Sequence, residues 1–307
     1  MPFEEHPTFP ATEHKDVKLW RYMNLPKYLS LLQTRSLFLS NLEVFAKVDP
    51  FEGSFPASLL EYRHWNTPED VPEDIRRSRL IGYKRGEDIG EDDCLQRYKE
   101  DRERMTRQIY AKRKSYYVNC WHISEYESSA MWDIYSRRNE GVAIVTSESR
   151  IKEAIKDSEK VVYGGVVTYA NYTEDDLDYE LENIYKLLLL KRQSFSYERE
   201  YRLAYTNPAV THKKYVIPSI EEQKRKGTWF ADEPGTIIDM PRSVEEIEQL
   251  DAEVGVQVQC NLHRLIDQIY VSPVAPDWFG AVIQDVTKKY GLDVSITKSS
   301  LSALPLQ

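Results

Sequence analysis

Residues 197–205 carry the segment YEREYRLAY, in which charged side chains alternate with tyrosines and aliphatic residues. The alternation predicts a β-strand, and successive side chains of a strand point to opposite faces of its sheet. Glu198, Glu200 and Arg202 would then share one face. Two carboxylates and a guanidinium in one row are costly to bury unless they pair with other charges or hold a ligand. The segment therefore predicts either a functional site or an ion-pair network inside a sheet.

The rest of the chain predicts an α+β fold. Strand-like segments recur with irregular spacing, and most are joined by links too short for a crossover between parallel strands. We expect a mixed, mostly antiparallel sheet flanked by helices. The predicted strands include residues 19–23, 36–40, 116–122, 141–146, 161–169, 254–260, 265–271 and 293–297. The predicted helices include residues 26–33, 128–137, 174–191 and 278–290. Residues 56–115 are charged and helical in character, so we interpret them as an insertion within a single domain of residues 1–307.

Composition limits the class of protein. A chain of 307 residues with 41% hydrophobic and 12% aromatic content is expected to fold as a globular protein. The net charge of −9 argues against attraction of the whole surface to nucleic acid or to an anionic membrane. Cys94, Cys120 and Cys260 form no CxxC pair, which favours a reduced protein. Since the chain also shows no signal peptide and no apolar run of membrane-spanning length, we expect a cytoplasmic protein with no membrane partner.

One stretch departs from the acidic average. The segment that begins at Arg97 and ends at Lys114, residues 97–114, holds eight basic residues against three acidic ones. A surface helix with a charged face explains this composition. The alternative is a contact with a nucleic-acid or protein acceptor, because clustered cations attract phosphate groups.

The common catalytic motifs are absent. The sequence contains no phosphate-binding GxxxxGK[ST], no GxGxxG, no HExxH and no GxSxG. Its six histidines are scattered without the spacing of metal ligands, so no metal is expected. P-loop, metalloenzyme and α/β-hydrolase functions therefore have no support in the sequence.

Several segments, in order, resemble the bacterial and phage family catalogued as domain of unknown function 2971. They are LWRY at 19–22, DPFE at 49–52, AMWDIY at 130–135, YEREYR at 197–202 and LIDQIYVSP at 265–273. The chain departs from the family pattern at Val48, where the family usually has asparagine. It also departs in CWHIS at 120–124, where residues 121–123 stand in place of part of the family's Cys-Ser-Phe-Ser motif. This second departure leaves Ser124 as the only serine of that motif.

Four residues also resemble the pattern of arginine–serine–glutamate ADP-ribosyltransferases. The resemblance implies that NAD is the substrate and that Arg21 holds its diphosphate, for which a bidentate guanidinium is suited. Ser124 would order the nicotinamide ribose, and Glu200 would stabilise the oxocarbenium-like cation. Glu198 would deprotonate the acceptor.

Three further residues complete the candidate site. Tyr22 or Trp132 would stack on the nicotinamide ring, and Arg202 would bind the ligand beside the carboxylates. Trp132 and Tyr135 are three residues apart on the predicted helix, which is a spacing typical of a helix face that packs in the core. A neighbouring carboxylate such as Glu52 is an alternative partner for Arg21.

Two functions from different classes follow. The first is an enzyme that consumes NAD, of the kind found in toxins or defence effectors. The second is a non-catalytic module that binds a nucleotide or a partner, with an ion-pair network at residues 198–202. The transferase hypothesis requires Arg21, Ser124 and Glu200 to line one cleft.

Overall fold

The structure, a computed structural model, describes residues 2–14, 16–80, 90–136, 138–173 and 183–302. The chain divides into two compact units. Unit 1 comprises Met1–Leu59, Tyr117–Tyr205 and Val254–Gln307, and unit 2 comprises Leu60–Tyr116 and Thr206–Glu253. Most of the predicted insertion at residues 56–115 falls in unit 2, where residues 206–253 join it.

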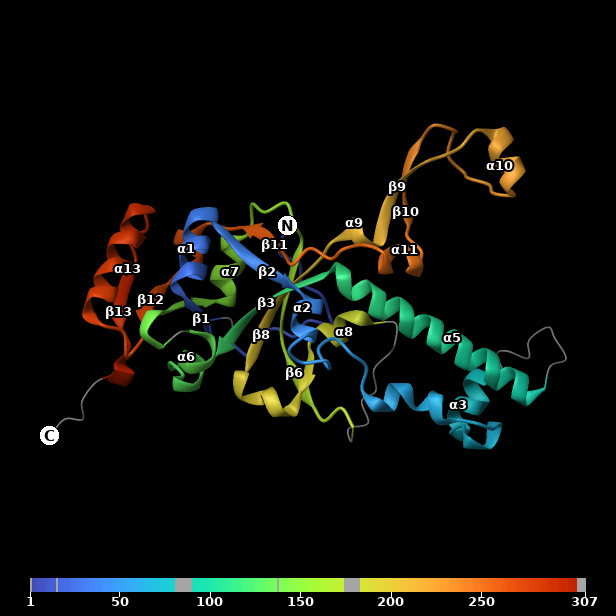
Figure 1. The fold of residues 1–307 in the computed structure, drawn as a ribbon, viewed down its shortest axis with the longest axis horizontal. Coiled ribbons are helices and arrows are strands. Elements are labelled where there is room, and N and C mark those ends of the chain that lie inside the picture. The colour runs from blue at the N-terminus through green and yellow to red at the C-terminus, as the bar shows by residue number, and fades with distance from the viewer. Residues whose placement is uncertain (1, 15, 81–89, 137, 174–182, 303–307) are drawn as a thin grey trace. The chain divides into compact units, whose positions relative to one another are not determined.

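Unit 1 is built on one large sheet (Figure 1), which has nine strands among the described residues. They are β1 (Lys18–Asn24), β2 (Ser36–Asn41), β3 (Tyr116–Ile123), β4 (Gly141–Ser147), β5 (Val162–Val166), β8 (Glu200–Thr206), β11 (Gly255–Gln259), β12 (Gln268–Val271) and β13 (Ser295–Lys298). Strands β11, β2, β3, β1, β4, β12 and β13 follow one another across the sheet, while β8 pairs with β3 and β5. Within the described part of the large sheet, β12 and β13 pair in parallel, whereas β1, β2 and β4 pair with their neighbours in antiparallel fashion. The predicted α+β class with a mixed, mostly antiparallel sheet is therefore confirmed.

Seven helices accompany the sheet in the described part of unit 1. They are α1 (Leu25–Thr34), α2 (Leu42–Ala46), α6 (Ser129–Tyr135), α7 (Glu148–Ala154), α8 (Ile184–Leu188), α12 (Leu262–Leu265) and α13 (Asp277–Lys289). Helix α1 begins where the sequence predicts, because the side chain of Asn24 accepts a hydrogen bond from the Lys27 amide and Pro26 lies in the first turn. None of the helices in the described part of the chain combines the length and the apolar character needed to span a membrane.

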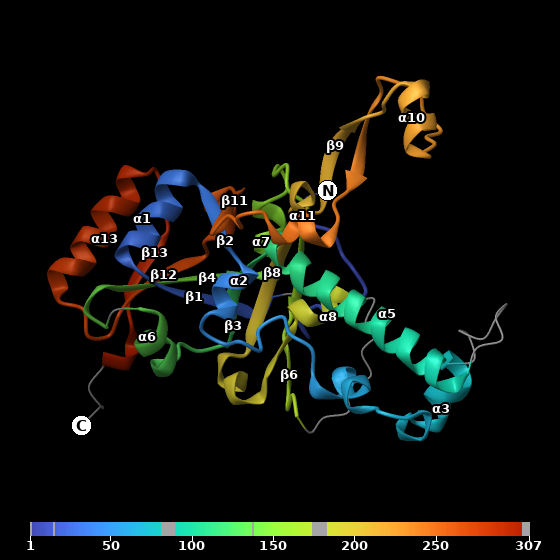
Figure 2. The same ribbon diagram turned by 45° about the vertical axis from the view of Figure 1, so that its right-hand side comes forward.

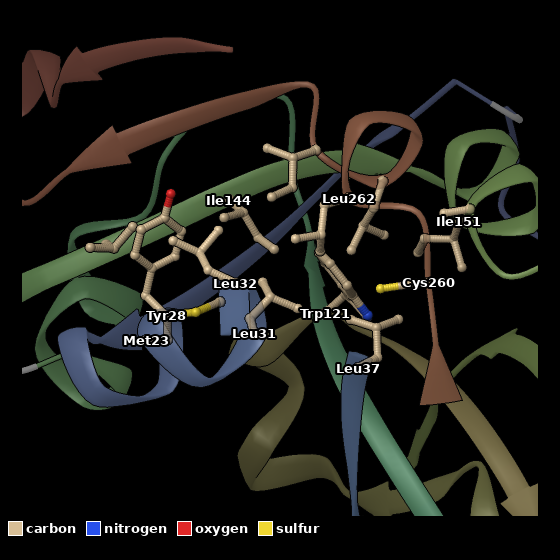
Figure 3. Packing of buried hydrophobic residues seen from close by; sticks show 14 of the residues in the cluster. Met23, Tyr28, Leu31, Leu32, Leu37, Trp121, Ile144, Ile151, Cys260 and Leu262 are labelled. Atoms are coloured by element: carbon tan, nitrogen blue, oxygen red, sulfur yellow. The ribbon is translucent and has the colours of Figure 1, made fainter. Parts of the chain in front are cut away.

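The two faces of the large sheet differ in character. One face carries Leu19, Met23, Trp121 and Leu203, and it packs against α1, α7 and α13 in the main hydrophobic core. We call it the helical face. Figure 3 shows Trp121 among Leu37, Leu262 and Cys260 within this core. The other face carries Trp20, Tyr22, Cys120, His122, Glu200 and Arg202. We call it the charged face, and side chains of α6 cover part of it.

Unit 2 contains short helices, one long helix and a separate two-stranded ribbon (Figure 2). Its elements are α3 (Glu73–Ile75), α5 (Glu91–Lys112), α9 (Pro208–Thr211), α10 (Ile220–Lys226), α11 (Val244–Glu248), β9 (His212–Val216) and β10 (Ile237–Pro241). The acidic residues Glu91, Asp92 and Asp93 occupy the first turn of α5, where the helix dipole favours negative charge. Tyr62, Trp65, Leu95 and Tyr98 belong to a small core of this unit.

Two predictions about the region of the charged segment are wrong. The strand expected to begin at residue 197 begins at Glu200, because Gln193–Glu198 forms a 3-10 helix and Arg199 has a left-handed backbone with φ of 40°. The helix expected over residues 174–191 ends at Leu188, and Lys191 lies in the short strand β7 (Leu190–Arg192), which pairs with β6 (Thr168–Ala170). Residues 174–182 of that prediction lie outside the described residues.

Candidate functional site

Five charged side chains form a continuous row on the charged face. Arg202 contacts the carboxylates of Glu200, at 2.7 Å, and Glu52, at 2.6 Å. Lys191 contacts Glu200 at 3.0 Å and Glu198 at 2.5 Å. All five residues are buried, and the exposed fraction is 0% for Arg202 and 2% for Glu200. We call Glu52, Lys191, Glu198, Glu200 and Arg202 the ion-pair row.

The local structure explains how these residues meet. Glu200 and Arg202 alternate along β8 and share its charged face, as the sequence predicts. Glu198 precedes the strand, yet its position at the end of the 3-10 helix still lets it reach Lys191. Arg202 also donates to the carbonyl oxygen of Leu188 at 2.5 Å, so the guanidinium is held by three acceptors.

The charges of the row stabilise one another. Burial alone would raise the pKa of Glu200, but the charges of Arg202 and Lys191 outweigh burial and hold this pKa well below its ordinary value. Burial would likewise lower the pKa of Lys191 and of Arg202, and the neighbouring carboxylates raise both pKa values above the ordinary range instead. The three groups are therefore charged at neutral pH, although water is excluded from them.

Neighbouring polar groups enclose the row. The hydroxyl of Tyr135 donates to Glu198 at 2.7 Å, and the hydroxyl of Tyr169 accepts a hydrogen bond from the Glu200 amide at 2.8 Å. His122 lies on the same face, opposite to Trp121, with Nδ1 at 2.6 Å from the carbonyl oxygen of Glu198. Cys120 lies beside Glu200, and burial together with this carboxylate raises the pKa of the thiol. The row is thus largely satisfied, although Nη2 of Arg202 is buried and makes no hydrogen bond within the described residues.

Arg21 lies on the opposite side of the sheet from the ion-pair row. Its guanidinium carbon is 5.7 Å from the ring centre of Trp121, which belongs to the helical face. Burial lowers the pKa of Arg21 to about 10, an effect that the thiols of Cys120 and Cys260 partly offset. Nη1 is buried and makes no hydrogen bond within the described ranges. Glu52, the suggested alternative partner, binds Arg202 instead.

A second cation lies close to Arg21. Burial and the charge of Arg21 lower the pKa of Lys27, which is in the first turn of α1. Among the residues that the structure describes, no carboxylate comes within ion-pair distance of either side chain. Arg21 and Lys27 are thus two cations without a carboxylate partner among the described residues, and Lys27 is exposed to solvent.

The remaining candidate residues contact other side chains and backbone groups of the protein. The Ser124 hydroxyl accepts a hydrogen bond from the Tyr126 amide at 3.2 Å, and its carbonyl oxygen accepts one from Trp20. Tyr22 and Trp132 are buried, with ring centres 4.9 Å apart in an edge-to-face arrangement. Neither ring offers an exposed face on which a ligand could stack. The structure does not bring Arg21, Ser124 and Glu200 into one cleft.

Basic side chains of the segment at residues 97–114 bind acidic side chains and carbonyl oxygens of the same unit. Arg107 binds Glu245 at 2.9 Å and Glu248 at 2.6 Å. Lys114 donates to the carbonyl oxygens of Glu248 and Leu250, each at 2.7 Å. The segment is largely α5 itself, and these contacts hold it to α11 and to Leu250 within unit 2.

Two members of the row were not identified as site residues from the sequence. The helix predicted over residues 174–191 would end at Lys191, where the helix dipole accounts for a cation, and Glu52 was suggested only as an alternative partner for Arg21. The charges of the segment could have indicated further partners. Two buried acids beside a single arginine require at least one more cation. No group of three histidine, cysteine, aspartate or glutamate residues in the described part of the chain is arranged to hold a metal ion.

Comparison with known proteins gives a family match over part of the chain. A family model described as "Protein of unknown function (DUF2971)" matches residues 131–203. The match confirms the predicted resemblance over this part of the chain, which contains Lys191, Glu198, Glu200 and Arg202 but not Arg21. No curated protein and no solved structure matches the chain.

Proposed function

We propose that the protein is a non-catalytic binding module for a small phosphate-bearing ligand, such as a nucleotide, and that the ion-pair row is structural. The observation that carries this proposal is the contrast between two arginines of the same sheet. Arg202 is held by two carboxylates, whereas Arg21 is partly buried on Trp121 and has no carboxylate partner among the described residues. A desolvated guanidinium without a counter-charge gains most from an anion.

The chemistry of the site favours phosphate over other ligands. Arg21 presents a planar fork of donors that matches two phosphate oxygens, and Lys27 adds a second positive charge nearby. The net charge of −9 opposes a long polyanion, so a small ligand is favoured over nucleic acid.

The transferase hypothesis has less geometric support. Glu200 is 2% exposed, and its two carboxylate oxygens contact Arg202 and Lys191. The carboxylate is therefore not accessible to a ribose hydroxyl. Arg21 faces away from it across the sheet. On the binding hypothesis, we expect no release of nicotinamide from NAD by the purified protein. Release that disappears in Glu200→Gln, with the variant still folded, would favour the transferase instead.

The binding hypothesis predicts a loss of affinity in Arg21→Gln. Hydrogen bonds to a charged group contribute about 1.5–3 kcal/mol, so the dissociation constant is expected to rise roughly 10- to 100-fold. Isothermal titration calorimetry with ADP, NAD and inorganic phosphate measures this change. Arg192→Gln is the matched control, since Arg192 also lies on an aromatic ring, 4.8 Å from that of Phe51, but is paired with Asp49.

Two outcomes would contradict the proposal. If the wild-type protein binds none of the three anions, the site has no phosphate ligand. If Arg21→Gln and Arg192→Gln bind with the wild-type affinity, the ligand lies elsewhere. We expect Arg21→Gln to fold normally, because removing a buried group that lacks a partner costs little stability.

A further inference from the structure

The ribbon formed by β9 and β10 has one face that is covered and one that is open. On the covered face, Tyr215 stacks on Phe230 with ring centres 5.7 Å apart, and Ile217, which follows β9, is buried. The open face consists of three cross-strand pairs, His212 with Pro241, Lys214 with Asp239 and Val216 with Ile237. All six residues are exposed. We call these six residues the ribbon face.

The ribbon face includes a pair of aliphatic side chains that are largely exposed to solvent. Val216 and Ile237 are 58% and 63% exposed and lie directly opposite each other. A two-stranded ribbon is marginally stable by itself in water, so burying this apolar pair against another surface would stabilise it. Among the described residues, the ribbon is a two-stranded sheet of its own.

We propose that the ribbon face docks onto the same face of a second copy of this chain. The argument is charge complementarity under two-fold symmetry. An interface with a two-fold axis pairs each surface with itself and therefore requires a self-complementary patch. Suppose that the two-fold axis lies between the two stacked ribbons and runs parallel to their strands. Each residue of one copy then faces, in the second copy, the residue that is its own cross-strand neighbour. Lys214 then faces Asp239 of the second copy, and Val216 faces Ile237.

The Lys214–Asp239 pair supports this arrangement. The two side chains are 2.9 Å apart and are 73% and 62% exposed, so both remain available to charges from another molecule. Stacking two ribbons would place four alternating charges in one layer and four apolar side chains in the next. Like charges would not be superposed, and the apolar pairs would be removed from water.

The test uses charge reversal at these two positions. We expect the wild-type chain to form a dimer in sedimentation velocity measurements over a range of concentrations. Lys214→Asp places acids opposite acids, and Asp239→Lys places lysines opposite lysines, so each variant alone is expected to dissociate at least tenfold more readily. A mixture of the two variants in equal amounts is expected to restore dimers, because Asp then faces Lys at every position.

The mixing experiment separates the interface from damage to the ribbon itself. Each variant loses the internal Lys214–Asp239 pair, and mixing cannot restore that pair within one chain, so recovery of the dimer requires contact between copies. Val216→Glu, checked for folding by circular dichroism, is expected to abolish the dimer through its apolar layer. A wild-type chain that stays monomeric, or single variants that dimerise as the wild type does, would overturn the proposal. This interface does not depend on the anion site at Arg21.

Discussion

Replacing Arg202 with methionine is expected to lower the free energy of unfolding by about 3–5 kcal/mol, because removing one partner of a buried pair leaves its counter-charges unpaired and desolvated. Glu52 and Glu200 would both lose their contact with the guanidinium. Urea unfolding measures the change as a lower midpoint at an unchanged slope. Such a loss would be several times that of an ordinary surface substitution.

The control for this prediction is an exposed pair in the same unit. Lys156 binds Glu153 at 2.7 Å, and both side chains are about half exposed, so Lys156→Met is expected to change stability by about 0–1 kcal/mol. A second test adds Glu52→Gln and Glu200→Gln to Arg202→Met, which removes the orphaned charges and is expected to recover much of the loss. A cost below about 1 kcal/mol for Arg202→Met would mean that water reaches the row, and the structural interpretation would fail.

The sequence predicts that Glu200 and Arg202 lie together, but it does not predict that Lys191 and Glu52 bind them. Alternation along β8 correctly places Glu200 and Arg202 together, because the spacing of a strand is a local property. Lys191 and Glu52 come from segments that meet β8 only through tertiary packing. Their local surroundings, a predicted helix end and a loop, contain no sign of that packing.

The same limit applies to the candidate site as a whole. Arg21 and Glu200 are correctly predicted to lie on strands, but whether they share a cleft depends on the order and register of β1, β3 and β8. In the structure, Trp20 is paired with His122 of β3, which sets Arg21 beside Trp121 and away from Glu200. A shift of one residue in this register would reverse the faces. Sequence order alone therefore cannot distinguish a catalytic cleft from two separate faces.

Acid is expected to destabilise the protein through Glu200. The pKa of Glu200 is held below its ordinary value of 4.5 in the folded chain, mainly by Arg202 and then by Lys191 against the opposing effect of burial. The unfolded chain therefore binds this proton at a higher pH than the folded chain does. The resulting stabilisation is fully present above pH 4.5 and is lost as the pH falls below it. A carboxyl group whose pKa falls by about two units on folding contributes roughly 2.6 kcal/mol at neutral pH.

This effect is separable from general acid unfolding. Urea unfolding between pH 7 and pH 3 is expected to show a steeper loss of stability in the wild type than in Glu200→Gln, by up to about 1.4 kcal/mol per pH unit. Glu153→Gln, which removes an exposed acid paired with Lys156 and Arg264, is expected to change the slope much less, because water screens these pairs. Equal slopes for the wild type and Glu200→Gln would show that Glu200 is not held ionised by the row. Since the row would then lack its central charge, the positions of Arg202 and Lys191 would need another explanation, such as an anionic ligand on the charged face.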